Sequence, residues 1–329
     1  LDGIIVGRHV LTTQSPKATT RVALAPAWSQ HLLTTRIGDS LTQRPVAASS
    51  IRIRDNRLEV NGEPFLIKGL VPVFPRQSPH LTPDIVFARY RDMGVNVLRL
   101  YHEASPEWMQ AARRHGLLIV EQPNGSTWNE ADPDSRWSLG RLMSRYEGLL
   151  EAHMGEPAAL MANFGNEIEL GGQTGAARSL EQAFKALVSR RPGQLAGYAT
   201  FKLDHRYCLP LIGINTPETG SLYWERALPH YRREWGAFFG AEFGGFLSDT
   251  EVTPTAIRLG RITTQWRILN ELDAAGGIFF YSHDNWAQPR FEGWNDPFSP
   301  DFADDLRGLW DHLDRPKTEL AVMQDIFSD

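Results

Sequence analysis

The stretch VNVLRLYHEASPEWMQAARRHGLLIV, residues 95–120, contains a complete strand–helix–strand unit. Val95–Leu100 and Leu117–Val120 are short apolar runs, the pattern of strands that are buried on both faces. Between them, Ser105-Pro106-Glu107 supplies a capping serine, a proline for the first helical turn and an acid beside it, and Gly116 is placed to end the helix. Two strands joined by a helix in this way lie parallel in one sheet.

The same alternation continues along the chain. Eight strands are expected, at Phe65–Val71, Val95–Leu100, Leu117–Val120, Leu160–Phe164, Leu195–Phe201, Leu209–Ile214, Ala237–Ala241 and Gly277–Ser282. Helices are expected after them, including Pro83–Met93, Ser138–Met154, Gly175–Val188, Thr253–Ala275 and Asp301–Leu313. Eight such units predict a closed (β/α)₈ TIM barrel over residues 51–329. An open doubly wound sheet is the alternative, but no G-x-G-x-x-G motif follows the first strand to support it.

The barrel is preceded by a hairpin and a less regular segment. Asn61-Gly62, between Val60 and Pro64, is a strong two-residue hairpin signal. Residues 1–50 show strand-like patches without a clear period, and we interpret them as a β-rich lead-in, the remnant of a preceding β domain. The chain starts at Leu1 without a signal segment, which indicates a processed protein or a piece of a longer multidomain chain.

The composition excludes several classes of protein. The chain has 42% hydrophobic and 22% charged residues and a net charge of -5, with its basic residues scattered, so we expect a packed, soluble protein that does not bind nucleic acid. No apolar run approaches the ~20 residues that span a bilayer. Cys208 is the only cysteine, which excludes an intrachain disulfide. These features leave the compartment undetermined, with periplasmic or extracellular locations expected if a signal segment is absent from this sequence.

Polar residues follow the expected strands, where the chemistry of a TIM barrel is placed. They include Arg99, His102, Glu121, Asn124, Asn166, Glu167, Asn215, Glu242, His283 and Trp286. Glu167 follows the fourth strand and Glu242 the seventh, on nearly opposite sides of an eight-strand ring. Two carboxyl groups that face each other across a substrate are what glycoside hydrolysis needs, one as the acid and one as the nucleophile or base. The simpler interpretation, that each glutamate pairs with an arginine or caps a helix, is less favoured for two such residues than for one.

Several of these stretches are similar to glycoside hydrolase family 2, within the clan of retaining (β/α)₈ glycosidases. The similarity covers about residues 51–329 and rests on LEVNGEPFLIKG, MGVNVLRLYHEASPEWMQAARRHGLLIVEQPN, EPAALMANFGNEIE, GAEFGGF and GLWDHLDRPKTELAVMQDIF. These stretches resemble, in order, the family's opening hairpin and first strand, its second and third units, its acid/base segment, its nucleophile strand and its closing helix. The resemblance implies a retaining glycosidase that acts on an oligo- or polysaccharide with no cofactor.

The resemblance also implies roles for individual residues. Glu167 would be the general acid/base, Glu242 the nucleophile and Asn166 a ligand of the sugar hydroxyl next to the reacting carbon. Arg99 would lie beneath the nucleophile and keep it ionised, and Trp286 would form the floor of the sugar subsite. Retention predicts carboxyl groups about 5–5.5 Å apart.

Two departures from the family leave other functions open. Family members usually have a tyrosine after the sixth strand that hydrogen-bonds the nucleophile, whereas this sequence reads Asn215-Thr216-Pro217-Glu218, and Tyr223 lies further along the chain than expected for that tyrosine. Complete N-terminal β-sandwich domains are also not recognisable. A transglycosylase that uses the same two glutamates is therefore the first alternative, and a non-catalytic carbohydrate-binding barrel is the second.

The remaining candidates are residues that would contact the substrate. His102, Glu121, Asn124, Asn215 and His283 are expected to hydrogen-bond sugar hydroxyls, and Trp128 is expected to stack on a sugar ring. Salt bridging is a somewhat stronger interpretation for Glu121. No metal site is expected, because no H-x-x-x-H or H-E-x-x-H spacing occurs. Lys68, Arg76 and Arg99 are cations that would suit an acidic sugar, but each also has a structural interpretation.

Overall fold

The computed structural model describes residues 31–37, 40–46, 51–74, 79–123, 139–152, 156–163, 166, 186, 189, 195–200, 211–215, 236–244, 254–284, 308–311 and 313–328. β1 (His31–Ile37) and β2 (Ser40–Val46) form an antiparallel pair. None of the helices in this part of the chain is long and apolar enough to cross a membrane.

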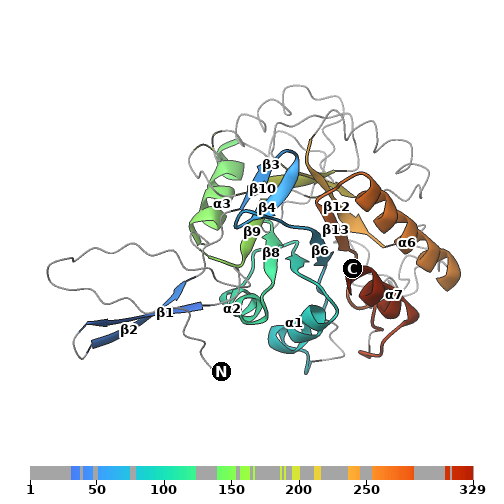
Figure 1. Cartoon of the computed structure of the whole chain (residues 1–329), viewed down its shortest axis with the longest axis horizontal. Coiled ribbons are helices and arrows are strands. Elements are labelled where there is room, and N and C mark those ends of the chain that lie inside the picture. The colour runs from blue at the N-terminus through green and yellow to red at the C-terminus, as the bar shows by residue number, and fades with distance from the viewer. Residues whose placement is uncertain are drawn as a thin grey trace.

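Eight parallel strands form a closed barrel (Figure 1). They are β6 (Ile67–Leu70), β7 (Val97–Arg99), β8 (Leu118–Glu121), β9 (Ala159–Asn163), β10 (Leu195–Thr200), β11 (Leu211–Asn215), β12 (Phe238–Phe243) and β13 (Gly276–Phe279). Each strand pairs with the next along the chain, and β13 pairs with β6 to close the ring. The predicted barrel and the positions of its eight strands are confirmed.

A three-stranded antiparallel sheet covers the end of the barrel where the strands begin. β3 (Ile51–Arg54), β4 (Arg57–Val60) and β5 (Glu63–Pro64) form it. Asn61 and Gly62 both have positive φ, as the predicted two-residue turn requires. Arg57 pairs with Asp273, just before β13, through an Nε–Oδ2 contact of 2.9 Å. Since this end is covered, the opposite end, where the strands finish, is left for a site.

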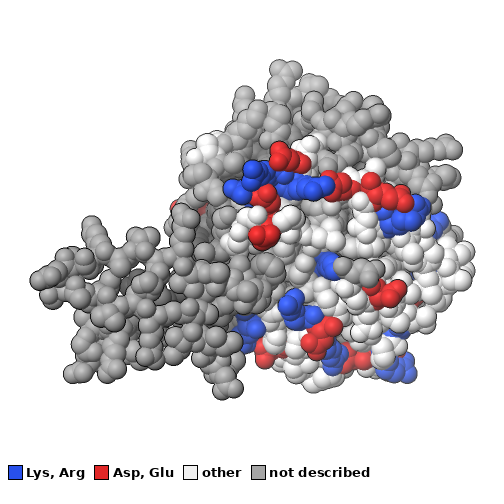
Figure 2. Space-filling view, viewed as in Figure 1, with Lys and Arg blue, Asp and Glu red and all other residues white. Residues whose placement is uncertain are grey.

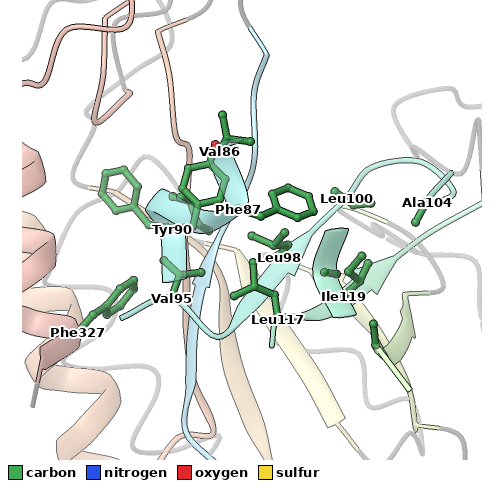
Figure 3. Packing of buried hydrophobic residues seen from close by; sticks show 14 of the residues in the cluster. Val86, Phe87, Tyr90, Val95, Leu98, Leu100, Ala104, Leu117, Ile119 and Phe327 are labelled. Atoms are coloured by element: carbon green, nitrogen blue, oxygen red, sulfur yellow. The ribbon is translucent and has the colours of Figure 1, made fainter. Parts of the chain in front are cut away.

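Side chains alternate between two cores along the strands. Val97 and Leu118 pack inside the barrel, whereas Leu98 and Ile119 pack outward against helices. The outer core includes Phe87 and other buried residues of the first two helical units (Figure 3). The strands are therefore apolar on both faces, as the sequence pattern indicates.

The helices lie outside the strands in Figure 1. They are α1 (Pro83–Asp92), α2 (Pro106–His115), α3 (Leu139–Ala152), α6 (Thr255–Glu271) and α7 (Thr318–Ser328). In α2 the Ser105 Oγ accepts the N–H of Trp108 at 3.3 Å, and Gly116 ends the helix in the left-handed region with φ 64°. Both predicted ends of α2 are confirmed.

One predicted helix is wrong in the part that the structure describes. Within the predicted helix Asp301–Leu313, residues 308–311 and 313 are bends, a bridge and a turn instead of a helix. The Asp311 Oδ1 accepts the N–H groups of Leu313 and Arg315 at 2.9 Å each, so this side chain stabilises a local turn in place of helical bonds. Residues 186 and 189 are helical, and the rest of the helix predicted around them lies outside the described residues.

Acidic and basic side chains are interspersed on the face shown in Figure 2. Described pairs include Arg52 with Glu59, whose Nε and Oε2 are 2.6 Å apart, and Arg267 with Glu271 on α6, at 2.7 Å. Such mixing fits the scattered basic residues of the sequence.

Candidate active site

Glu242 lies in a β-bulge of strand β12. The register shifts by one residue against β11, between Ile214 and Asn215, and again against β13, between Gly240 and Phe243. β12 therefore carries one more residue than either neighbour needs, which is the definition of a bulge.

The bulge changes which way the end of β12 faces. Ala241 packs in the core inside the barrel and Phe243 in the outer core, although residues two apart in a regular strand share one face. Glu242 is the residue between them, and its side chain reaches the interior group Arg99. The bulge thus directs this carboxylate into the barrel while Phe243 keeps its outer packing.

Arg99, the last residue of β7, is the centre of the site. Its Nη1 donates to the Glu242 Oε1 at 2.9 Å and to the carbonyl oxygen of Ala241 at 2.7 Å. The Arg99 side chain is fully buried and that of Glu242 is 8% exposed, so the pair is an interior one. Such a hydrogen-bonded partner of opposite charge offsets the cost of burying a carboxylate.

Asn166 is held by the same guanidinium. The Arg99 Nη2 donates to the Asn166 Oδ1 at 2.6 Å, and Asn166 is buried. Arg99 therefore links the segment after β9, which carries the Asn-Glu pair of the sequence, to the bulge in β12. These two segments are the ones that the sequence pattern selects as the sources of the two catalytic carboxylates.

Tyr101 is a site residue that sequence reasoning missed. Its hydroxyl donates a hydrogen bond to the Glu242 Oε1, and its ring lies under the Arg99 guanidinium with Cζ 4.6 Å from the ring centroid. The available signal was its spacing: Tyr101 lies two residues after Arg99, and residues two apart along an extended chain point the same way.

Glu121, at the end of β8, is buried, and its Oε2 accepts the N–H of Ala104 at 2.8 Å. Burial raises the pKa of the Glu121 carboxyl from 4.5 to about 7, against the lowering effect of that hydrogen bond. Because the folded-state pKa is the higher one, the stability from this group is fully present below about pH 4.5 and is lost as the pH rises through 7. The geometry indicates that Glu121 fixes the loop after β7, and contact with substrate remains a prediction.

The two predicted histidines lie in different surroundings. His102 is exposed, and its Nδ1 is 2.8 Å from the Glu103 carbonyl oxygen, so it stays a candidate for substrate contact. His283 is fully buried, with Nδ1 3.0 Å from the Ser282 Oγ and Nε2 3.1 Å from the Asp314 Oδ1. Burial lowers the pKa of His283, which favours the neutral ring. This geometry favours a packing role for His283 over contact with a sugar.

Several predicted residues lie outside the described part of the chain. They are Glu167, Asn124, Trp128 and Trp286, together with the side chain of Asn215, whose backbone ends β11. Lys68 is described and does not face the site: its Nζ donates to the Phe327 carbonyl oxygen at 2.7 Å. Among the described residues, no group of three His, Cys, Asp or Glu side chains is arranged to hold a metal ion.

A closed barrel with a buried, arginine-paired glutamate at the carboxyl end of a strand is the architecture of a (β/α)₈ glycosidase. Known proteins agree with this class. A β-galactosidase of Klebsiella pneumoniae is 26% identical over 136 residues, which cover 37% of this chain and 13% of that protein. A β-galactosidase of Photobacterium profundum is 25% identical over 133 residues, with the same coverage. No protein-family model matches the sequence.

Solved structures share the fold over most of the chain. The glycoside hydrolase family 2 β-galacturonidase of Eisenbergiella tayi has a TM-score of 0.70 and 17% identity, and covers 94% of this chain and 61% of its own. A β-glucuronidase of an uncultured Clostridium species has a TM-score of 0.71 and 13% identity, and covers 92% and 58%. The described barrel thus shares the fold of these solved glycosidases, and part of the sequence is similar to β-galactosidases. The chain spans 13% of the length of the curated relatives it matches and about three fifths of these structures.

Proposed function

We propose that this chain hydrolyses a β-linked glycoside with retention of configuration, using Glu242 as the nucleophile and Glu167 as the general acid/base. The observation that supports this most strongly is the interior Arg99–Glu242 pair, whose guanidinium also binds Asn166, the residue before Glu167. One buried cation thereby joins the two segments that carry the carboxylates.

The reaction has two displacements. In the first, the Glu242 carboxylate bonds to the anomeric carbon while the bond from that carbon to the leaving oxygen breaks, and Glu167 gives its proton to that oxygen. In the second, Glu167 takes a proton from water, the water oxygen bonds to the anomeric carbon, and the ester bond to Glu242 breaks. Arg99 stabilises the Glu242 carboxylate as its charge returns in this second step.

For the substrate, only the class of sugar is proposed. The relatives are named for β-galactoside, β-glucuronide and β-galacturonide substrates, so a β-linked hexose or hexuronic acid is the substrate class to test. Of the cations considered for an acidic sugar, Arg99 already binds protein groups and Lys68 faces α7. Arg76, the third of these cations, lies outside the described residues, so neutral and acidic sugars are both to be tested.

The test compares wild type, Glu167→Gln and Glu242→Gln on aryl β-galactosides, β-glucuronides and β-galacturonides. Glu271→Gln is a matched control, because Glu271 lies on the outer surface of α6 with its side chain 58% exposed. We expect the two site variants to lose at least about 1,000-fold in kcat, with the control unchanged. NMR should show a β-configured first product, and longer products would reveal transfer to a sugar.

A second variant separates catalysis from folding. Glu242→Ala leaves space beside Arg99, and azide should restore turnover of a dinitrophenyl glycoside and give the α-glycosyl azide. Binding of glycans by an inactive wild type would favour a carbohydrate-binding barrel instead. Full activity in either glutamine variant would remove that glutamate from the mechanism.

A further inference from the structure

Tyr101 contacts the proposed nucleophile from the second strand of the barrel. Its hydroxyl donates to the Glu242 Oε1, the same oxygen that accepts the Arg99 Nη1 at 2.9 Å. In family 2 the resemblance implies a tyrosine after the sixth strand for this hydrogen bond, whereas here β11 ends at Asn215 and the sequence continues Thr216-Pro217-Glu218. Among the described residues, the tyrosine that donates to Glu242 follows β7, another strand of the same ring.

The Tyr101 ring is held from two sides. The Arg99 Cζ lies 4.6 Å from its centroid, over one face, and the ring of Phe280 meets it nearly edge-on, with centroids 6.1 Å apart and an angle of 88°. A cation over the ring face withdraws electron density from it, which makes the phenol a stronger hydrogen-bond donor. Both contacts fix the direction of the hydroxyl before a substrate arrives.

The backbone of Tyr101 is held by a short relay of amides. The Gln122 Nε2 donates to the Tyr101 carbonyl oxygen at 3.3 Å, and the Gln122 Oε1 accepts from the Asn163 Nδ2 at 3.0 Å. Gln122 and Asn163 are buried and follow or end the two neighbouring strands, β8 and β9. The position of the phenol is thus fixed by three consecutive strands of the barrel.

We propose that Tyr101, which follows the second barrel strand, positions the nucleophile of this enzyme. The proposal rests on the function proposed above, because it needs Glu242 to attack the sugar. Tyr101 acts through Glu242 and transfers no proton. Its hydroxyl stabilises the carboxylate form of Glu242, which is consumed in the first displacement and regenerated in the second.

This role predicts an unequal effect on the two displacements. A donor that favours the free carboxylate assists the second step, in which the carboxylate is the leaving group, more than the first, in which its charge is lost. Removing the hydroxyl should therefore slow the breakdown of the glycosyl-enzyme most. A hydrogen bond to a charged group corresponds to about a 10- to 100-fold change in rate.

The experiment is steady-state and burst kinetics of Tyr101→Phe with the dinitrophenyl glycoside of the sugar that wild type cleaves fastest. Phenylalanine keeps the ring contacts with Arg99 and Phe280. We expect kcat and KM to fall together, by about 10- to 100-fold, with a smaller change in kcat/KM. The burst should release one molecule of dinitrophenol per folded active site. Intact-protein mass spectrometry should show the accumulated glycosyl-enzyme.

The control is Tyr146→Phe, which removes a hydroxyl from a fully buried tyrosine on α3, in the outer core. It should leave kcat and KM unchanged. Because the burst counts competent sites, a loss of folding in Tyr101→Phe would lower the burst and not KM.

Three results would overturn the proposal, and the last of them is distinguishable from the other two. An active wild type with kcat and KM unchanged in Tyr101→Phe would show that the hydroxyl does not position Glu242. An equal loss in kcat and kcat/KM with KM constant would likewise exclude the unequal effect on the second step. A wild type with no turnover and no adduct would remove the proposed function itself and this inference with it.

Discussion

Gly277→Ala tests whether the bulge in β12 aims Glu242. Gly277 lies in β13 opposite the bulge, and an added Cβ would be 2.8 Å from the Leu269 Cδ1 and 3.0 Å from the Phe243 Cε1. The leucine end can rotate away, but the phenylalanine ring is part of the outer core and directly follows Glu242 in the chain. Displacing this ring should therefore move the Glu242 carboxylate, the proposed nucleophile.

The expected size follows from packing. Overfilling a buried site costs about 1–3 kcal/mol in the free energy of unfolding, and a misplacement of about 1 Å at a reacting group costs about 100-fold in rate. We therefore expect Gly277→Ala to fold, with a lower urea midpoint and a kcat/KM reduced by about 10- to 100-fold. Urea unfolding and turnover of an aryl β-glycoside by the folded fraction measure these two quantities.

Gly69→Ala is the matched control for Gly277→Ala. Its Cβ would be 2.5 Å from the Ile278 Cγ1, so it also disturbs the junction of β6 and β13, but not Phe243. It should lower stability at least as much while the folded fraction keeps its kcat/KM. If Gly277→Ala lost stability and kept full activity, or if both variants lost activity in proportion to stability, the bulge would not be what aims Glu242.

Three further predictions concern Arg99, Glu121 and Ser105. Arg99→Lys keeps a charge but cannot serve the three oxygens now bound at 2.6–2.9 Å, so we expect a loss of about 3–5 kcal/mol in urea unfolding and at least about 100-fold in kcat/KM; an unchanged midpoint would contradict this. Glu121→Gln keeps an acceptor for the Ala104 N–H and removes the ionisation. It should match wild type below about pH 4.5 and exceed its unfolding free energy by up to about 3 kcal/mol at pH 8, and a less stable variant at pH 8 would refute the raised pKa. Ser105→Ala removes the N-cap of α2 and should lower the free energy of unfolding by about 1 kcal/mol in a thermal melt, with kcat unchanged. A loss of kcat would instead show that α2 helps to position the site.

The regular part of the fold could be predicted because its signals are local. The cap at Ser105, the left-handed Gly116 and the apolar runs on either side of α2 are each readable within a few residues of sequence. The helix expected up to Leu313 was wrong for a local reason, because the Asp311 side chain accepts backbone N–H groups in a turn. The sequence could not reveal this, since the residue types there suit a helix as well as a turn.

The site was predictable in its residue types and less so in its geometry. Arg99 and Glu242 were selected because they follow predicted strands, and the structure brings them together. The bulge that aims Glu242 is visible only as a register shift against β11 and β13, which no single segment encodes. The hydrogen bond from Tyr101 likewise depends on the distance between β7 and β12 across the ring.

His283 is a residue that the sequence selected as a substrate ligand and that the structure places in a packing role. Its place after the last barrel strand makes it resemble a substrate ligand in the sequence, but the structure buries it against Trp310, with ring centroids 5.2 Å apart. Its ring nitrogens contact the buried Ser282 and Asp314, whose side chain is 12% exposed. Burial, which comes from the distant segment around residue 310, decides between the two roles.

The most direct test of the account is to trap the glycosyl-enzyme. A fluorosugar β-glycoside with a dinitrophenyl leaving group forms the ester rapidly and hydrolyses it slowly, so one sugar should attach per protein molecule. Mass spectrometry of peptic peptides should place that sugar on Glu242, and Glu242→Gln should stay unlabelled. Labelling of another carboxylate, or hydrolysis with inversion and no adduct, would contradict the assignment of Glu242 as the nucleophile.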